Sequence, residues 1–153
     1  MEVDRDRAEV VATVMRFWQA YERKDLAALS NMLTAADDFI FFGSDAAEVV
    51  RTRGKWEELM RNDWQLFETI RFAEPRNIAV QMSADKQLAS IVYEVTDFSL
   101  VEGKKIESLD RFAMTMRKEA GAWRVVQGMT AVATKGESSA EIAARRRKEA
   151  PKP

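Results

Sequence analysis

The chain has 153 residues, 46% hydrophobic and 32% charged, with 24 basic and 25 acidic side chains, which predicts one globular domain without a general attraction to nucleic acid or anionic membranes. The absence of cysteine and histidine excludes disulfides, thiolate chemistry, a histidine general base and the usual zinc ligand sets, so acid–base chemistry would fall to Asp, Glu, Tyr or Lys. No apolar run is long enough to span a membrane and the charged start is unlike a signal peptide, so we expect a cytoplasmic protein.

Three helices are predicted in the first 68 residues. Residues 6–24 carry one apolar stripe at helical spacing, formed by Val10, Val14, Phe17, Trp18 and Tyr21. A shorter helix follows Asp25, which can act as its N-cap, and a strand at residues 36–42 stops at Gly43. Residues 55–68 form the third helix, whose apolar face includes a single acid: Trp56, Leu59, Met60, Asp63, Trp64 and Phe67.

Four long strands are predicted next, at residues 69–83, 87–101, 104–118 and 122–134. The short links between them carry turn residues, which indicates an antiparallel meander and an α+β fold. Residues 1–134 therefore form a single domain. Residues 135–153 are a polar, basic tail, read as a helical extension or as disordered. This tail lacks interleaved aromatic residues, so nucleic-acid binding is not expected.

Side-chain alternation along the meander sorts the strands into two faces. The more apolar face should lie under the helices, and its polar members are Arg76, Tyr93, Asp97, Asp110 and Gln127. Arg76 is expected across from Tyr93, and Asp97 within about one residue pair of Asp110. The opposite face mixes apolar and charged groups and is predicted to form a homodimer through Val92, Glu94, Arg111, Ala113, Thr115 and Gly128.

Two motifs resemble a known family. The first is an aromatic strand and turn with a following Glu and a helix-opening Gly, Phe39-Ile40-Phe41-Phe42-Gly43-Ser44-Asp45 with Glu48 and Gly54; the second is Gly121-Ala122-Trp123-Arg124-Val125-Val126. Over roughly residues 10–133 the chain resembles SnoaL-like (polyketide-cyclase-like) domains of the nuclear transport factor 2-like, or ketosteroid isomerase-like, superfamily. The resemblance implies a cone-shaped, cystatin-like α+β fold, with three N-terminal helices packed on a strongly curved antiparallel sheet around a pocket. Relatives often carry histidine on the last strand, where this chain has Gln127 and Met129.

Asp97 and Asp110 are the candidate catalytic residues, because two neighbouring carboxyl groups near apolar walls can raise one pKa toward neutrality. The candidate ligand-binding residues are Trp18, Tyr21, Trp56, Met60, Trp64, Arg76, Tyr93, Phe112, Met114, Gln127 and Met129. Structural roles compete with each of these. Arg76 would merely neutralise the acids, and the aromatic side chains would be ordinary core. The Asp45 side chain would accept hydrogen bonds from backbone N–H groups of its own turn.

Two functions remain open. The first is binding of a small, hydrophobic, oxygen-bearing molecule, with isomerase, cyclase or hydrolase chemistry carried by carboxyl groups and without a metal or cofactor. The second is an oligomerisation module similar to the association domain of calcium/calmodulin-dependent protein kinase II, in which the pocket has no function.

Overall fold

The computed structural model describes residues 2–149, which contain four helices and seven strands. The helices are α1 (Glu2–Glu22), α2 (Leu26–Asn31), α3 (Arg53–Leu66) and α4 (Ser139–Glu149). The strands are β1 (Ile40–Phe42), β2 (Val49–Val50), β3 (Thr69–Phe72), β4 (Arg76–Met82), β5 (Leu88–Val101), β6 (Lys104–Glu119) and β7 (Ala122–Val132).

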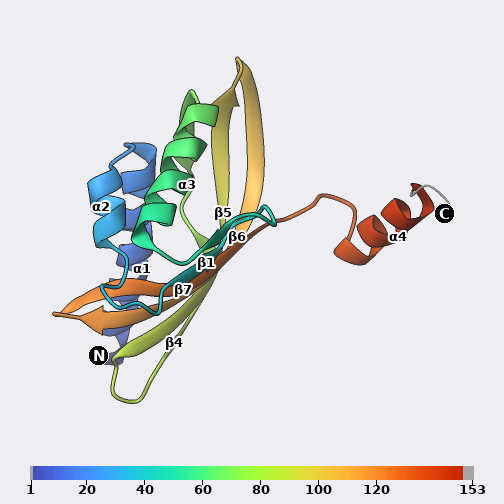
Figure 1. Cartoon of the computed structure of the whole chain (residues 1–153). Helices are drawn as coiled ribbons and strands as arrows, with labels where there is room; N and C mark the ends of the chain where they lie inside the picture. The colour runs from blue at the N-terminus through green and yellow to red at the C-terminus, as the bar shows by residue number, and fades with distance from the viewer. Residues whose placement is uncertain (1, 150–153) are drawn as a thin grey trace.

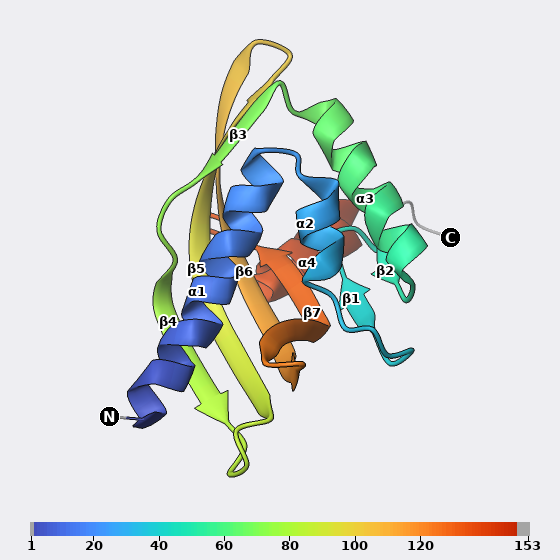
Figure 2. The same cartoon turned by 90° about the vertical axis from the view of Figure 1, so that its left-hand side faces the viewer.

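Helices α1, α2 and α3 cover one face of a curved sheet, and α4 stands apart from them on the other side (Figures 1 and 2). Side-chain caps start two of these helices. The Asp25 carboxylate accepts from the backbone N–H of Ala28, at 3.0 Å, and the Thr52 hydroxyl accepts from that of Lys55, at 3.2 Å. The predicted α+β fold, with three helices over a curved sheet, is confirmed. No helix within residues 2–149 is long and apolar enough to cross a membrane.

The strands are ordered β2-β1-β7-β6-β5-β3, with β4 also paired to β5. All pairs are antiparallel except β1 with β7, which is parallel. The predicted strand at 69–83 is two strands that follow one another along the same edge of β5, separated at residues 73–75. The β5–β6 ladder runs from Leu88 to Val101 without a register shift, so its side chains alternate as the sequence predicts.

A bulge in β7 changes which of its side chains face inward. Thr115 pairs with Gln127 but Met116 pairs with Val125, so one extra residue sits in β7 between them. One extra residue exchanges the two faces of a strand beyond that point. The predictions that Gln127 and Met129 face the interior were therefore wrong: Gln127 is exposed and Met129 is 48% exposed.

Gly128 turns inward instead of joining the outer face as predicted. A Cβ atom built on it would lie 2.8 Å from Cδ2 of the buried Phe41 ring. Phe41 pairs with Gly128 across the parallel β1–β7 contact, and only a residue without a side chain leaves room for its ring.

A second irregularity, at the start of β4, corrects the position of Arg76. The register shifts between Arg76 and Ala79, and Asn77 in the shifted segment has φ of 52°. Arg76 consequently pairs with Glu94 on the outer face, where its Nε lies 3.7 Å from the Glu94 carboxylate. The predictions that Arg76 lies across from Tyr93 and faces the interior were wrong.

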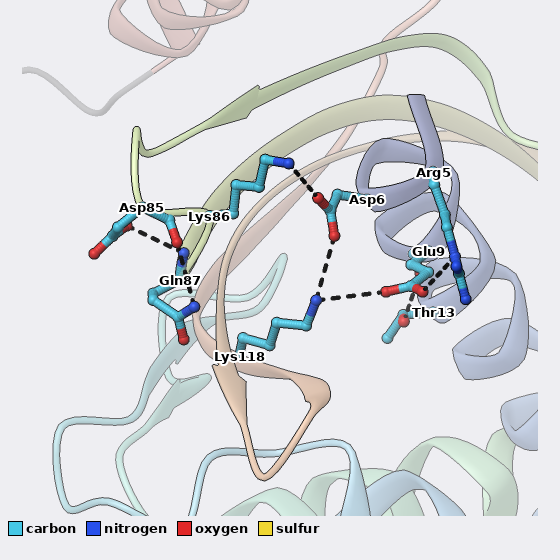
Figure 3. A network of polar contacts seen from close by, with 8 residues as sticks. All are labelled: Arg5, Asp6, Glu9, Thr13, Asp85, Lys86, Gln87 and Lys118. Carbon is cyan, nitrogen blue, oxygen red and sulfur yellow. Dashed lines mark hydrogen bonds and ion pairs between the residues drawn. The ribbon is translucent and has the colours of Figure 1, made fainter. Parts of the chain in front are cut away.

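Ion pairs fix the first half of α1 across the end of the sheet (Figure 3). The Asp6 carboxylate lies 3.2 Å from Lys86 in the β4–β5 turn and 3.3 Å from Lys118 on β6. Lys118 also lies 3.7 Å from Glu9. The apolar stripe of α1 packs below these contacts, with Val10 and Val14 at 1% exposure or less. The packing of this stripe and the ion pairs together position α1, whose later residues line the cavity described next.

Candidate functional site

A cavity of about 330 Å³ lies between the helices and the inner face of the sheet. Its lining comes from α1 and α3, from the segment between Phe41 and Glu48, and from β3, β5, β6 and β7. The walls are largely aromatic. The polar lining residues are mainly carboxyl and hydroxyl groups, including Asp63, Asp97, Asp110, Ser99 and Ser108.

Trp18 organises the aromatic wall. Its ring lies 4.4 Å from that of Phe72 and 4.8 Å from that of Phe112, measured between centroids. Its indole N–H donates to the Tyr93 hydroxyl at 3.2 Å, and the Tyr93 ring stacks on Phe112 at 5.4 Å. Such mutual contacts restrict the rotamers of these rings, so the shape of the wall is set by its own packing.

Asp97 and Asp110 form a carboxyl pair on the inner face of the sheet. Asp97 on β5 pairs with Ser108, while Asp110 on β6 pairs with Val95, so the two acids are diagonal neighbours. Burial is the largest of the causes that raise the pKa of Asp97 to about 7. A hydrogen bond with Asp110 and charge repulsion from Asp110 add to the rise. Burial also raises the pKa of Asp110, although the hydrogen bonds from Asp97 and Ser108 oppose that rise. The proton of the pair is therefore held mainly on Asp97, and it is lost as the pH rises through about 7.

A second carboxyl site lies on α3. The Tyr21 hydroxyl donates to Asp63 Oδ2 at 2.9 Å. Burial raises the pKa of Asp63 to about 6, with a further rise from the charge on Glu48, while the bond from Tyr21 opposes it. Burial and the neighbouring Asp63 raise the pKa of Tyr21 well above its usual value. The phenol is thus a neutral donor at physiological pH.

The structure brings together only part of the predicted site. Seven of the predicted residues line the cavity, namely Trp18, Tyr21, Trp56, Met60, Asp97, Asp110 and Phe112. Tyr93 and Met114 are buried behind this lining, and Trp64 is half-buried with its ring 5.7 Å from that of Tyr21. Arg76, Gln127 and Met129 lie outside the cavity, as the bulges require.

Sequence reasoning missed Asp63, Ser99, Ser108 and Thr130 as cavity residues. Asp63 had a usable signal, because it is the one acid on the apolar face of its helix. Ser99 and Ser108 lie on the inward parity of β5 and β6, so strand alternation could have found them. Thr130 could not be found in this way, since the β7 bulge reverses its parity.

The turn between β1 and β2 brings a further carboxylate to the cavity. Asp45 accepts from the backbone N–H of Ala47 at 2.8 Å, the turn role considered for it, and its own N–H donates to Glu48 Oε2 at 3.1 Å. Glu48 lines the cavity and lies over Gly43, where an added Cβ would come within 2.0 Å of Oε2. Gly43 is thus required for Glu48 to fold back toward the cavity.

Comparison with known proteins agrees with this geometry. Residues 10–134 match the SnoaL-like domain family. A structure of a proposed dehydratase of the NTF2-like family from Streptomyces avermitilis superposes with a TM-score of 0.76 at 17% identity, covering 86% of this chain and 99% of that one. An NTF2-like protein with a cystatin-like fold from Novosphingobium aromaticivorans gives 0.72 at 18% identity, covering 93% and 90%.

A ketosteroid isomerase-like protein from Erwinia carotovora atroseptica gives a TM-score of 0.68 at 17% identity, covering 83% of this chain and 95% of that one. At these identities the likeness establishes the fold alone. No protein of curated function matches the chain.

Proposed function

The chain belongs to the SnoaL-like domain family, and on that premise we propose that it binds a small hydrophobic molecule in its cavity and catalyses proton transfer on it. The observation that carries this proposal is the Asp97–Asp110 pair at the wall of an aromatic cavity. Burying two carboxyl groups together is costly, and perturbed pKa values of this kind concentrate at functional sites. Solved relatives described as a proposed dehydratase and as ketosteroid isomerase-like are consistent with chemistry of this class.

The pair supplies an acid and a base at the same pH. In the proposed step the ionised Asp110 takes a proton from a carbon next to a ligand carbonyl, while Asp97 donates its proton to the carbonyl oxygen. One C–H bond breaks, one O–H bond forms on the ligand, and the pair as a whole keeps its charge. A general acid and base matched to the working pH contribute roughly 10²–10⁴-fold each. The reaction class is enolisation, which isomerases, dehydratases and cyclases can share.

Deuterium exchange provides a direct test, because it needs only the proton-transfer step. The bicyclic ketone 2-tetralone, in D₂O, would be followed by NMR for loss of the proton beside its carbonyl. We expect the protein to accelerate exchange, and Asp97→Asn or Asp110→Asn to remove most of the acceleration. Quenching of tryptophan fluorescence by the ketone should remain, since the aromatic walls are intact. Acceleration that survives in both variants would contradict the assigned roles.

We further propose a homodimer formed through the outer face of the sheet. A row of paired apolar residues crosses this face from β4 to β2: Ala79, Val92, Ala113, Met129, Phe42 and Val49. Its four larger members are 44–48% exposed, which is unusual for a contiguous apolar strip on a monomer. The strip keeps the predicted Val92 and Ala113 and, because of the β7 bulge, includes Met129 in place of Gly128.

An oligomerisation module remains the weaker alternative. Its outer face would be functional and its cavity would not. Such a module has no need of two carboxyl groups buried together. Their burial lowers stability, so selection would remove them from a protein that made no use of them.

A further inference from the structure

The charge of the cavity lining is one-sided. Four acids line it from separate elements, Glu48 from the β1–β2 turn, Asp63 from α3, Asp97 from β5 and Asp110 from β6. No Lys or Arg among the described residues lines it. With one proton shared by the β-strand pair, the lining remains strongly negative at neutral pH. An anionic ligand placed there would meet repulsion without any compensating partner.

The rings around these acids have the complementary property. Eight lining residues are aromatic, and three of them, Trp18, Tyr21 and Phe72, contact one another with centroids 4.4–6.1 Å apart. An aromatic face attracts a cation, and the attraction grows when the cation leaves water. Carboxylates and ring faces in one enclosure therefore favour the same kind of ligand, a positively charged group on an apolar body.

We propose that the cavity selects a hydrophobic organic cation, an amine whose ammonium group lies against Asp63 and Glu48 while its ring or chain fills the aromatic part. This inference rests on the proposed function, since it takes the cavity to be the ligand site. A metal ion is a poorer fit, because no three His, Cys, Asp or Glu side chains within residues 5–149 converge as ligands.

Two features support Asp63 and Glu48 as the partners of the ammonium group. Tyr21 occupies Oδ2 of Asp63, which leaves the other oxygen to accept from a ligand. The charge on Glu48 reaches Asp63 and raises its pKa, so a cation between them would relieve that repulsion.

Trp56 is 1% exposed and lines the cavity, and its indole N–H has no partner among the described residues. An oxygen on the ligand would satisfy that donor.

The test compares probes that share one bicyclic body and differ in charge. Binding of 2-aminotetralin (cation), 2-tetralol (neutral) and tetralin-2-carboxylate (anion) would be measured at pH 7 by tryptophan fluorescence and calorimetry. We expect the amine to bind about tenfold more tightly than the alcohol, and the carboxylate to bind most weakly. Asp63→Asn and Glu48→Gln should each weaken the amine about fivefold and leave the alcohol unchanged.

The matched control is Asp37→Asn, which removes the same charge from an exposed position outside the cavity and should change no affinity. Circular dichroism establishes whether each variant is folded. If Asp63→Asn does not fold, Glu48→Gln alone is enough to test the inference. An alcohol that binds as tightly as the amine would overturn this inference and leave the ligand-binding function standing. If none of the three probes nor 2-tetralone bound, the proposed function would fail, and this inference with it.

Discussion

Replacing Asp97 by Asn tests whether this carboxyl group carries a proton in the folded protein near neutral pH. Its pKa rises from 3.8 to about 7 on folding. The folded protein therefore binds this proton more tightly than the unfolded chain does. The resulting stabilisation is fully present below pH 3.8 and is lost as the pH rises through about 7.

The size of the effect follows from the shift. Each pKa unit corresponds to about 1.4 kcal/mol, so a rise to about 7 sets a ceiling of roughly 4 kcal/mol. Asp110 shares the proton and the cavity opens toward water, and both reduce the net value. We expect the free energy of unfolding to fall by about 2 kcal/mol between acidic and neutral pH because of this pair.

Other acids titrate in other pH ranges, so their effect on stability can be separated from that of Asp97. The pKa of Asp63 is raised to about 6, so its contribution is largely lost below the pH at which Asp97 ionises. Asp38, Asp85 and Glu94 have lowered pKa values, because Arg117, Ser83 and Arg111 respectively bond to the ionised carboxylates. Their stabilisation is present at neutral pH and is lost only as the pH falls below their usual range. The Asp97–Asp110 pair therefore dominates the interval from pH 6 to 8, in which Asp63 loses only the last part of its proton.

Urea denaturation followed by tryptophan fluorescence would give the free energy of unfolding at each pH for the wild type, Asp97→Asn and the exposed control Asp37→Asn. The wild type and the control should lose stability with rising pH across this interval. Asp97→Asn should be nearly flat, because the amide cannot ionise and can donate to Asp110. Parallel profiles for all three proteins would show that Asp97 ionises normally, and the acid role proposed for it would be refuted.

Three further outcomes are expected. Light scattering should show a dimer for the wild type and a monomer for Val92→Glu or Met129→Glu, whereas a monomeric wild type would remove the proposed interface. Deleting residues 135–153 should change the melting temperature by less than about 2 °C, because α4 has no buried residue, and a drop of many degrees would mean that this segment docks on the body or on a partner. Gly128→Ala should cost about 1–3 kcal/mol in urea denaturation by displacing the Phe41 ring, and an unchanged midpoint would contradict the assigned packing.

Much of the fold could be read from local pattern. The apolar stripes of α1 and α3 and the alternation of β5 and β6 are properties of residues near each other in sequence, and they depend only on helical and strand periodicity. Asp97 and Asp110 were placed correctly on the inner face because the β5–β6 ladder is continuous and its turn is short. The same reasoning placed Trp18, Tyr21 and Phe112 at the cavity wall.

What only the tertiary structure decided begins at the two bulges. A bulge adds one residue to a strand, and no particular residue type marks its position in the sequence. Side-chain alternation therefore assigned Arg76, Gln127 and Met129 to the wrong face of the sheet. The contact of Tyr21 with Asp63 likewise joins two helices 42 positions apart in the chain. Periodicity determines which side of its own element a residue occupies. Register and packing between elements determine which residues meet, and they depend on the whole chain.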